Sequence, residues 1–163
     1  MKIHGFCDAS STGYGACLYV RFKNENFSYS FNLLCSKSRV EPLKTITISR
    51  LELSGALWLV NLLEKTLKAI DTKIEKIFLW WDSMILLHWL KTSPNFLNTY
   101  VANRVNLIQK LSIQAQWGHV ISSKNPADFL TRGQLKNEFK KIIFGDMVQR
   151  GCEIQKFHDP FHH

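Results

Sequence analysis

Four acidic residues of this chain stand where predicted strands end or predicted helices begin. They are Asp8, Glu52, Asp82 and Asp128. Three of them follow a predicted strand, and Glu52 lies in the first turn of a long predicted helix. The chain has only 13 acidic residues, so their placement at such positions is informative. Because functional sites in open α/β sheets gather at strand ends, the pattern predicts one acidic site at a sheet edge.

Carboxylates gathered at one edge would suit divalent cations that act on a phosphodiester. Mg²⁺ prefers oxygen ligands and keeps several of its waters, so each ion takes only one or two protein carboxylates. Two ions about 4 Å apart can bind both the attacking and the leaving oxygen of a phosphodiester. Four clustered carboxylates repel one another unless cations and a polyanionic substrate complete the site. The acids therefore predict a site for two ions.

Each acid also has a local structural explanation that the sequence leaves open. Residues 49–52 read Ser-Arg-Leu-Glu, which is the pattern of a capping box at a helix start. Asp82 would suit the N-cap of the next helix, and Asp8 would suit an Asx turn. Residues 125–128 combine an N-cap asparagine, a proline at the first helical position and a first-turn acid. Taken together, however, four acids at four element ends favour a shared site.

The composition is that of a single globular domain with a polyanionic partner. The chain has 163 residues, of which 45% are hydrophobic and 21% charged, and these values exclude a disordered chain. Its formal charge of +8 and isoelectric point near 9.4 favour nucleic acid as the partner. No apolar stretch could span a bilayer, no signal peptide fits the start, and the four cysteines form no CxxC pair. We therefore expect a reduced, intracellular protein that is neither secreted nor membrane-bound.

Hydrophobic periodicity predicts an α/β fold in which three hairpin strands precede the helices. Alternation predicts strands at 2–8, 16–23, 27–36, 75–81 and 114–121. Helical spacing predicts helices at 49–67, 83–91, 97–112 and from 126. This order implies a mixed five-stranded sheet, with its first three strands antiparallel, flanked by helices. We expect a basic loop over 37–48, this domain over 1–133, and a C-terminal helix and poorly defined tail over 134–163.

Four sequence blocks resemble a known family in their order along the chain. They are HGFCDASSTGYGACLY, LLCSKSRVEPLKTITISRLELSGAL, WWDS and WGHVISSKNPADFLTRG. Together they resemble the ribonuclease H domain of retrotransposon polyproteins, most closely the BEL/Pao group, over roughly residues 3–133. One block alone would be a weak signal, but the combination is specific.

The resemblance implies a ribonuclease H-like fold and a metal-dependent endonuclease that cuts the RNA strand of RNA/DNA hybrids. The four acids correspond to the family's catalytic ligands of two Mg²⁺ or Mn²⁺ ions, and Thr47 to a threonine near a DNA-strand phosphate. The residues that we expect to contact the substrate are Ser10, Thr47, Arg50, Ser83 and Asn125. The 2′-hydroxyl would distinguish the two strands. An upstream reverse transcriptase domain is implied as a partner, and the cytoplasm, nucleus or a retroelement particle as the location.

Two departures from the family pattern bear on activity. The loop before Asp128 has no histidine, whereas cellular members carry one there that is thought to aid product release. The segment 91–113 lacks the basic cluster that cellular members use for hybrid binding. His119 lies earlier, on a predicted strand, where we expect it to be structural. The alternative is therefore a catalytically inactive module that binds nucleic acid or a polymerase, and the four intact acids are the feature against it.

Overall fold

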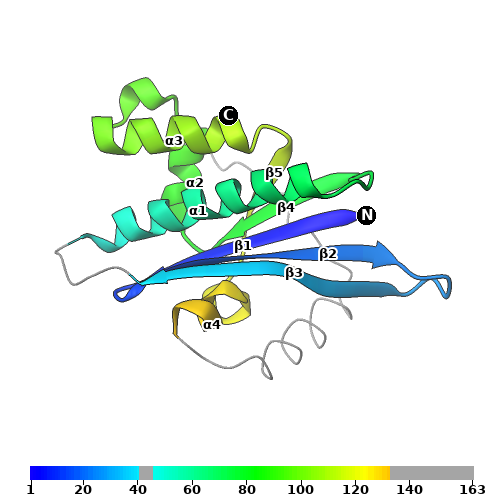
Figure 1. Ribbon diagram of the computed structural model, residues 1–163. Helices are drawn as coiled ribbons and strands as arrows, with labels where there is room; N and C mark the ends of the chain where they lie inside the picture. The colour runs from blue at the N-terminus through cyan, green and yellow to red at the C-terminus, as the bar shows by residue number, and fades with distance from the viewer. Residues whose placement is uncertain (41–45, 133–163) are drawn as a thin grey trace, which may run out of the picture.

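A computed structural model describes residues 1–40 and 46–132, which form one sheet with helices on both faces (Figure 1). The strands are β1 (Lys2–Ser10), β2 (Gly13–Lys23), β3 (Tyr29–Val40), β4 (Lys76–Trp81) and β5 (Ala115–His119). The helices are α1 (Ile48–Ala69), α2 (Met84–Lys91), α3 (Thr99–Leu111) and α4 (Ala127–Thr131), with short 3₁₀ turns η1 (Pro94–Phe96) and η2 (Ser122–Lys124). The segment 134–163, for which we expect a helix and tail, lies outside the described residues.

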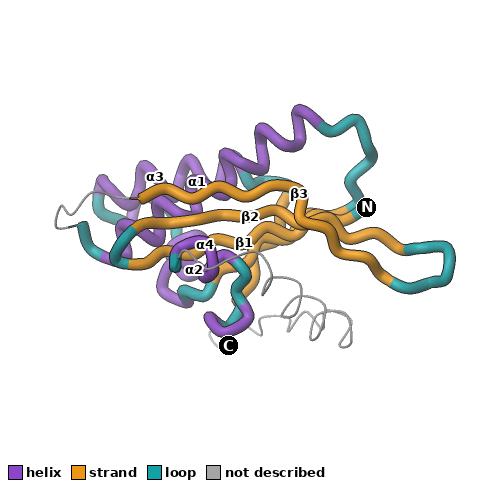
Figure 2. Tube along the Cα trace, turned by 60° about the horizontal axis from the view of Figure 1, so that its bottom comes forward, coloured by secondary structure: helices purple, strands orange, loops and turns teal. Residues whose placement is uncertain are grey.

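The strands are arranged in the order β3-β2-β1-β4-β5. β2 pairs antiparallel with both β1 and β3, whereas β4 is parallel to β1 and β5 is parallel to β4. This topology confirms the predicted mixed five-stranded sheet with three antiparallel strands first. The carboxyl ends of β1, β4 and β5 therefore lie at one edge, and the β2–β3 hairpin extends from the opposite end (Figure 2). Within residues 1–40 and 46–132, the helices fall short of the length or the hydrophobicity that a membrane span requires.

Helices α1, α2 and α3 cover one face of the sheet, and α4 lies on the other (Figure 1). Alternate residues of β1, including Ile3 and Cys7, are fully buried in the core that α1 completes. Gly5 stands between them. A Cβ at this position would come within 2.7 Å of Leu79 and 2.9 Å of Leu59, so glycine allows α1 to pack directly against the sheet.

The opposite face of β1 carries an aromatic layer that contains a buried histidine. His4 is 1% exposed, and its ring stacks on Phe78 with 5.1 Å between the centroids. Trp80 Nε1 donates a hydrogen bond to His4 Nδ1 at 3.2 Å, so this nitrogen acts as an acceptor. Burial, followed by the positive charges of Arg21 and Lys2, lowers the pKa of His4 from 6.5 to about 4. His4 is therefore neutral at physiological pH.

We expect His4 to make the protein less stable in weak acid. The unfolded histidine binds a proton near pH 6.5 and the folded one only near pH 4, so the unfolded state is protonated first as the pH falls. The free energy of unfolding should drop by about 2 kcal/mol between about pH 7.5 and pH 5, and by about 3 kcal/mol at pH 4. Urea unfolding of wild type and His4→Gln measures this. An equal drop in both proteins would assign the effect to other groups.

Strand β3 is longer than the alternating pattern predicts. The expected basic loop over 37–48 is wrong at both ends, because β3 continues to Val40 and α1 begins at Ile48. Lys37 pairs with Ala16 of β2, so the neighbouring strand supplies the hydrogen-bonding partners that favour strand over loop. The middle of the expected loop, 41–45, lies outside the described residues. The basic side chain of Lys37 consequently belongs to the edge strand.

Candidate active site

Asp8 lies near the end of β1 and inside the sheet. It pairs with Gly15 of β2 and β1 continues to Ser10, so the Asx turn that would explain Asp8 locally does not form. The side chain is 7% exposed, and Thr131 Oγ1 of α4 donates a hydrogen bond to Asp8 Oδ2 at 2.6 Å. A Cβ at Gly15 would come 3.0 Å from Leu130, so the glycine opposite Asp8 allows α4 to approach this closely.

The surroundings of Asp8 disfavour its charged form. Burial raises its pKa, the hydrogen bond from Thr131 lowers it, and the carboxylates of Asp82 and Asp128 raise it further. The net result is a pKa of about 6 instead of 3.8. Asp82 follows β4, the parallel neighbour of β1, and Asp128 lies on α4, whose Thr131 contacts Asp8. Asp82 and Asp128 therefore share a site with Asp8.

Glu52 reaches the same edge from α1. The N-cap of α1 is Thr47, so Glu52 lies in the second turn rather than the predicted first turn, and the capping box does not form. Burial and the carboxylate of Asp82 raise the pKa of Glu52, a hydrogen bond with Ser83 lowers it, and Asp8 raises it. Glu52 is thus free of a capping role and is coupled electrostatically to two of the other acids.

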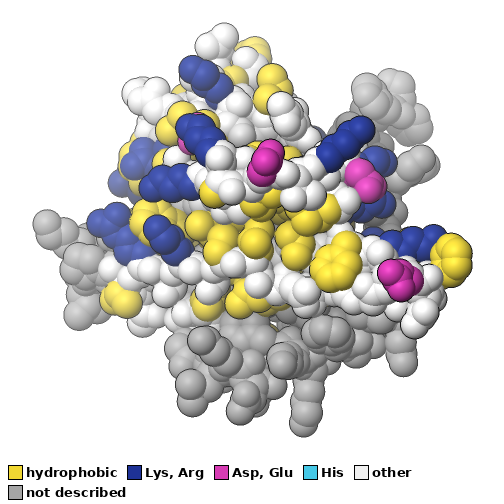
Figure 3. Space-filling view, turned by 45° about the vertical axis from the view of Figure 1, so that its right-hand side comes forward, with side chains coloured by type: hydrophobic (Ala, Val, Ile, Leu, Met, Phe, Trp, Pro, Cys, Tyr) yellow, Lys and Arg dark blue, Asp and Glu magenta, His cyan; other side chains and the backbone are white. Residues whose placement is uncertain are grey.

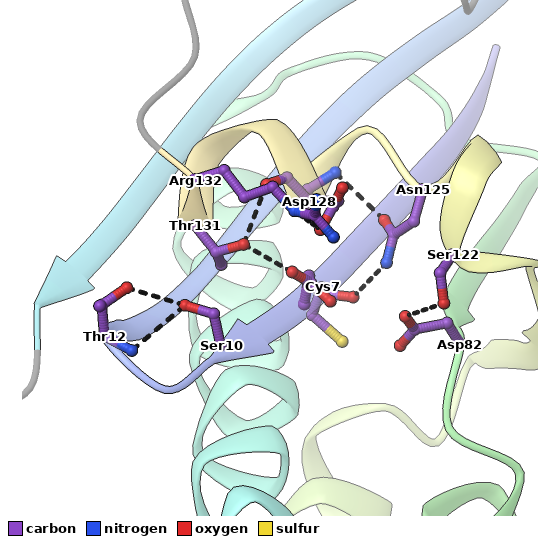
Figure 4. Close-up of polar contacts among 11 residues, drawn as sticks. Cys7, Ser10, Thr12, Asp82, Ser122, Asn125, Asp128, Thr131 and Arg132 are labelled. Carbon is purple, nitrogen blue, oxygen red and sulfur yellow. Dashed lines mark hydrogen bonds and ion pairs between the residues drawn. The ribbon is translucent and has the colours of Figure 1, made fainter.

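Asp82 directly follows β4, as predicted. The N-cap of α2 is Ser83, so Asp82 does not cap that helix. Ser122 Oγ of the turn after β5 donates a hydrogen bond to Asp82 Oδ2 at 2.8 Å (Figure 4). His119 Nε2 lies 3.3 Å from the backbone oxygen of Asp82, which is the kind of structural contact expected for it. The last residue of β5 and the turn that follows it therefore each contact Asp82.

Asp128 lies in the first turn of α4, also as predicted. Arg132 Nε donates a hydrogen bond to Asp128 Oδ1 at 2.8 Å, which forms an ion pair four residues apart (Figure 4). Because Thr131 on the same helix contacts Asp8, α4 brings both a fourth carboxylate and a hydroxyl donor to the site.

Asn125 holds the start of α4 against β1. Its side chain is 1% exposed, its Nδ2 donates to the backbone oxygen of Cys7 at 2.8 Å, and its Oδ1 accepts from the backbone N–H of Ala127 at 3.1 Å (Figure 4). The expectation that Asn125 contacts the substrate does not fit this position, because the chain folds its amide inward onto the backbone. Asn125 is placed to position Asp128 and Thr131.

The four acids thus gather at one edge of the sheet, and their chemistry suits divalent cations. Within residues 1–40 and 46–132, no group of three or more His, Cys, Asp or Glu side chains is arranged to hold a metal ion as it stands. Each carboxylate instead has a donor partner: Thr131, Ser83, Ser122 or Arg132. Burial and, after it, mutual repulsion raise the pKa of Asp8 and Glu52, and bound cations would offset both effects, so the donor set fits such ions.

Two arginines form a stack on one tyrosine near the start of α1. The Arg50 guanidinium lies 4.4 Å from the centroid of the Tyr100 ring, and the Arg104 guanidinium lies 3.6 Å from it. Neither arginine forms an ion pair with a carboxylate in the part of the chain that the structure describes. Thr47 caps α1 three residues before Arg50. One arginine of α1 and one of α3 therefore place two positive charges at this end of α1.

Ser10 lies at the end of β1, where its Oγ is 2.9 Å from Thr12 Oγ1. The sequence predictions also missed several residues of the site, namely Thr131, Ser122, Arg132, Tyr100 and Arg104. The spacing of Asp128 and Arg132 by four helical positions would have indicated their ion pair. The hydrogen bonds of Thr131 with Asp8 and of Ser122 with Asp82 leave no such pattern in the sequence, because the partners lie 123 and 40 residues apart.

Comparisons with known proteins agree with this architecture. The sequence model of the family described as "Pao retrotransposon-like RNaseH-like domain" matches residues 1–83. No curated protein sequence matches the chain. The structure of LC11-RNase H1, isolated from compost, is similar with a TM-score of 0.57 and 15% identity, over 81% of this chain and 94% of that one.

Two further solved structures have the same coverage, 81% of this chain and 94% of theirs. LC11-RNase H1 in complex with an RNA/DNA hybrid has a TM-score of 0.56 and 13% identity. The N-terminal RNase H domain of rv2228c from Mycobacterium tuberculosis, fused to maltose-binding protein, has a TM-score of 0.55 and 14% identity. Likeness at such identities establishes the fold, and the predicted ribonuclease H-like architecture is confirmed.

Proposed function

Because the chain belongs to the family of Pao retrotransposon-like RNaseH-like domains, we propose that it is a metal-dependent endonuclease that hydrolyses the RNA strand of RNA/DNA hybrids. The observation that carries the proposal is the placement of the four acids at one sheet edge, where side chains of neighbouring elements contact Asp8 and Asp82. LC11-RNase H1, which has a similar fold, was solved with an RNA/DNA hybrid, and this supports the same class of substrate here. A reverse transcriptase domain is the protein partner that we propose.

The residues that would hold the cations are Asp8, Glu52, Asp82 and Asp128. When bound, two Mg²⁺ or Mn²⁺ ions supply the positive charge that activates a water and stabilises the leaving oxygen of the phosphodiester. Asp8 is the most buried of the four acids, and the negative charges of Asp82 and Asp128 also disfavour its charged form. Its charged form therefore depends most on the positive charge of the cations. Asp8 is therefore the acid whose loss would be felt most strongly.

The neighbouring side chains orient these carboxylates. The hydroxyls of Thr131 and Ser122 each contact one oxygen, Oδ2 of Asp8 and Oδ2 of Asp82, and so limit side-chain rotation without adding charge. Arg132 balances the charge of Asp128, which lies on a helix rather than on the sheet. Held orientation of this kind is what supporting hydrogen bonds supply around metal ligands.

The Arg50–Tyr100–Arg104 stack supports a polyanionic substrate. A guanidinium that lies over an aromatic ring is held in place, while its N–H groups at the ring edge can still donate to phosphate oxygens. The stack lies at the start of the helix that carries Glu52, and the chain has a formal charge of +8. We propose that this stack and Thr47 bind the backbone of one strand, while the hydroxyls of Ser10 and Ser83 face the other.

The direct test is a cleavage assay with strand-labelled duplexes. In Mg²⁺ the protein should nick the RNA strand of an RNA/DNA hybrid and leave the DNA strand and double-stranded DNA intact, because the 2′-hydroxyl distinguishes RNA. EDTA should stop the reaction, and double-stranded RNA serves as the matched control. A protein that binds hybrids tightly yet never cuts them in Mg²⁺ or Mn²⁺ would refute the proposed activity.

One observation favours a second function, the binding of nucleic acid without catalysis. Each of the four carboxylates already has a donor partner, and Asp128 is held in an ion pair by Arg132. Calorimetric titration with Mn²⁺ in the absence of nucleic acid separates the two functions. An enzyme should show saturable binding of two ions, whereas a module in which Arg132 permanently replaces a cation should show none.

A further inference from the structure

A shallow groove lies between α1 and β3, away from the four acids. Its volume is about 30 Å³, and its lining residues are Lys37, Trp58, Asn61, Leu62 and Lys65. Lys37 comes from β3, and the other four come from two successive turns of α1. The groove therefore brings lysines from two different elements to one place.

Trp58 lines this groove, and its indole carries a buried hydrogen-bond donor. Its ring packs against Tyr14 in an edge-to-face arrangement, with 5.9 Å between centroids and 76° between planes, so its orientation is held. The Nε1–H is buried and has no acceptor among the described residues. Buried donors are nearly always paired in folded proteins, so an unpaired one requires an explanation. An acceptor atom on a bound ligand, rather than on the protein, would explain why this donor has no partner.

The charges around the groove indicate an anion as that acceptor. Neither Lys37 nor Lys65 forms an ion pair with a carboxylate in the described part of the chain. The acid nearest in sequence to Lys65, Glu64, is bound by Lys68 at 2.9 Å, four residues along the helix. No acidic residue lines the groove. Two ammonium groups and one indole N–H thus share a groove with no counterion.

The sheet register places the groove within reach of a strand bound at the acids. Lys37 pairs with Ala16, which pairs with Cys7, the residue before Asp8. Lys37 therefore lies two strands away from Cys7, about 10 Å across the sheet. Figure 3 turns the hairpin end of the molecule forward and shows Lys and Arg side chains on both sides of an apolar band, with a few acidic side chains among them.

We infer that this groove binds a backbone phosphate of the nucleic acid, outside the segment that is cut. The indole N–H and the two ammonium groups would donate to the phosphate oxygens. The identity of the polyanion rests on the proposed function, whereas the anion site itself rests only on the groove. Nucleic-acid affinity comes largely from such phosphate contacts, which do not read sequence.

The first experiment observes the Trp58 indole N–H directly by NMR of the ¹⁵N-labelled chain, with Trp58→Phe to assign its signal. Inorganic phosphate, and separately a hybrid duplex in EDTA, should each shift this signal. A signal that neither probe moves would overturn the anion site. A shift with inorganic phosphate and none with the hybrid would overturn its assignment to nucleic acid.

The second experiment compares two double variants that remove the same charge. Lys37→Gln/Lys65→Gln should weaken hybrid binding in EDTA about tenfold at low salt and reduce the salt slope by about one. Lys73→Gln/Lys110→Gln removes two exposed lysines elsewhere and should change affinity less than about twofold. Equal losses in the two pairs would overturn the inference. Cleavage in Mg²⁺ is measured separately. If the protein does not cut the hybrid but the NMR signal of Trp58 still shifts with phosphate and with the hybrid, only the proposed function is contradicted.

Discussion

Asp8→Asn should abolish cleavage of the hybrid, with a loss of at least ~10³-fold in rate, comparable to removing a preorganised catalytic group. The substitution removes one negative charge and almost no volume. Asp8 is also the most buried of the four acids, at 7% exposed. A single-turnover assay in saturating Mg²⁺ measures the effect. Asp71→Asn, at an exposed position beyond α1, is the matched control and should leave the rate unchanged.

The same substitution should stabilise the protein when cations are absent. The pKa of Asp8 is raised from 3.8 to about 6, so above pH 6 the folded state carries a charge that the unfolded state accommodates more easily. Asparagine lacks this cost and can still accept from Thr131, so the free energy of unfolding at about pH 7.5 should rise by up to about 3 kcal/mol. Urea unfolding in EDTA tests this. A destabilised Asp8→Asn would contradict this account, in which burial and the neighbouring carboxylates both penalise the charged form of Asp8.

Asn125→Ala should impair both stability and activity, although Asn125 is not expected to touch the substrate. The change leaves the Cys7 carbonyl and the Ala127 N–H without their partner in a buried place. Unpaired buried groups of this kind cost about 1–3 kcal/mol each, so a loss of about 2–6 kcal/mol is expected for the two. Because α4 then loses its attachment to β1, the cleavage rate should fall about 10–100-fold, as for other groups that support metal ligands.

Gln109→Ala is the control for that experiment. Gln109 also joins two elements through a side-chain amide, since its Nε2 donates to the backbone oxygen of Leu90 at 2.8 Å, but it does so on the opposite face of the sheet. The Gln109→Ala substitution should lower the free energy of unfolding, but under conditions in which the variant is folded it should leave the cleavage rate nearly unchanged. If both variants lost activity equally, the loss would reflect general stability and not the placement of α4.

The arrangement of the sheet and its helices was largely predictable, because the patterns that specify them are local. The strand predicted at 75–81 is β4 (Lys76–Trp81), and the helix predicted at 97–112 is α3 (Thr99–Leu111). In both cases a run of apolar residues with one clear period decides the element. The predicted strand ends before the end of β3, because the last basic residues of β3 adopt a strand conformation only by pairing with β2. Such pairing is a tertiary interaction, which the local sequence pattern does not show.

The four acids could be found from the sequence, but their partners could not. An acid at the end of an element is visible in the chain, whereas Thr131 contacts Asp8 only because α4 packs beside β1. Asn125 shows the same limit. An asparagine before a helix suggests a cap or a contact with solvent and ligands, and only the packing shows that its amide faces inward.

The contact between Asn125 and Cys7 joins residues 118 positions apart, and this has a consequence for how the protein is made. Closing so long a loop is entropically costly, and distant contacts of this kind slow folding. A growing chain on the ribosome can form the β1–β2 hairpin early, but it cannot assemble the complete acidic cluster until α4 has emerged. Nuclease activity would therefore begin only after nearly all of the described domain has been synthesised.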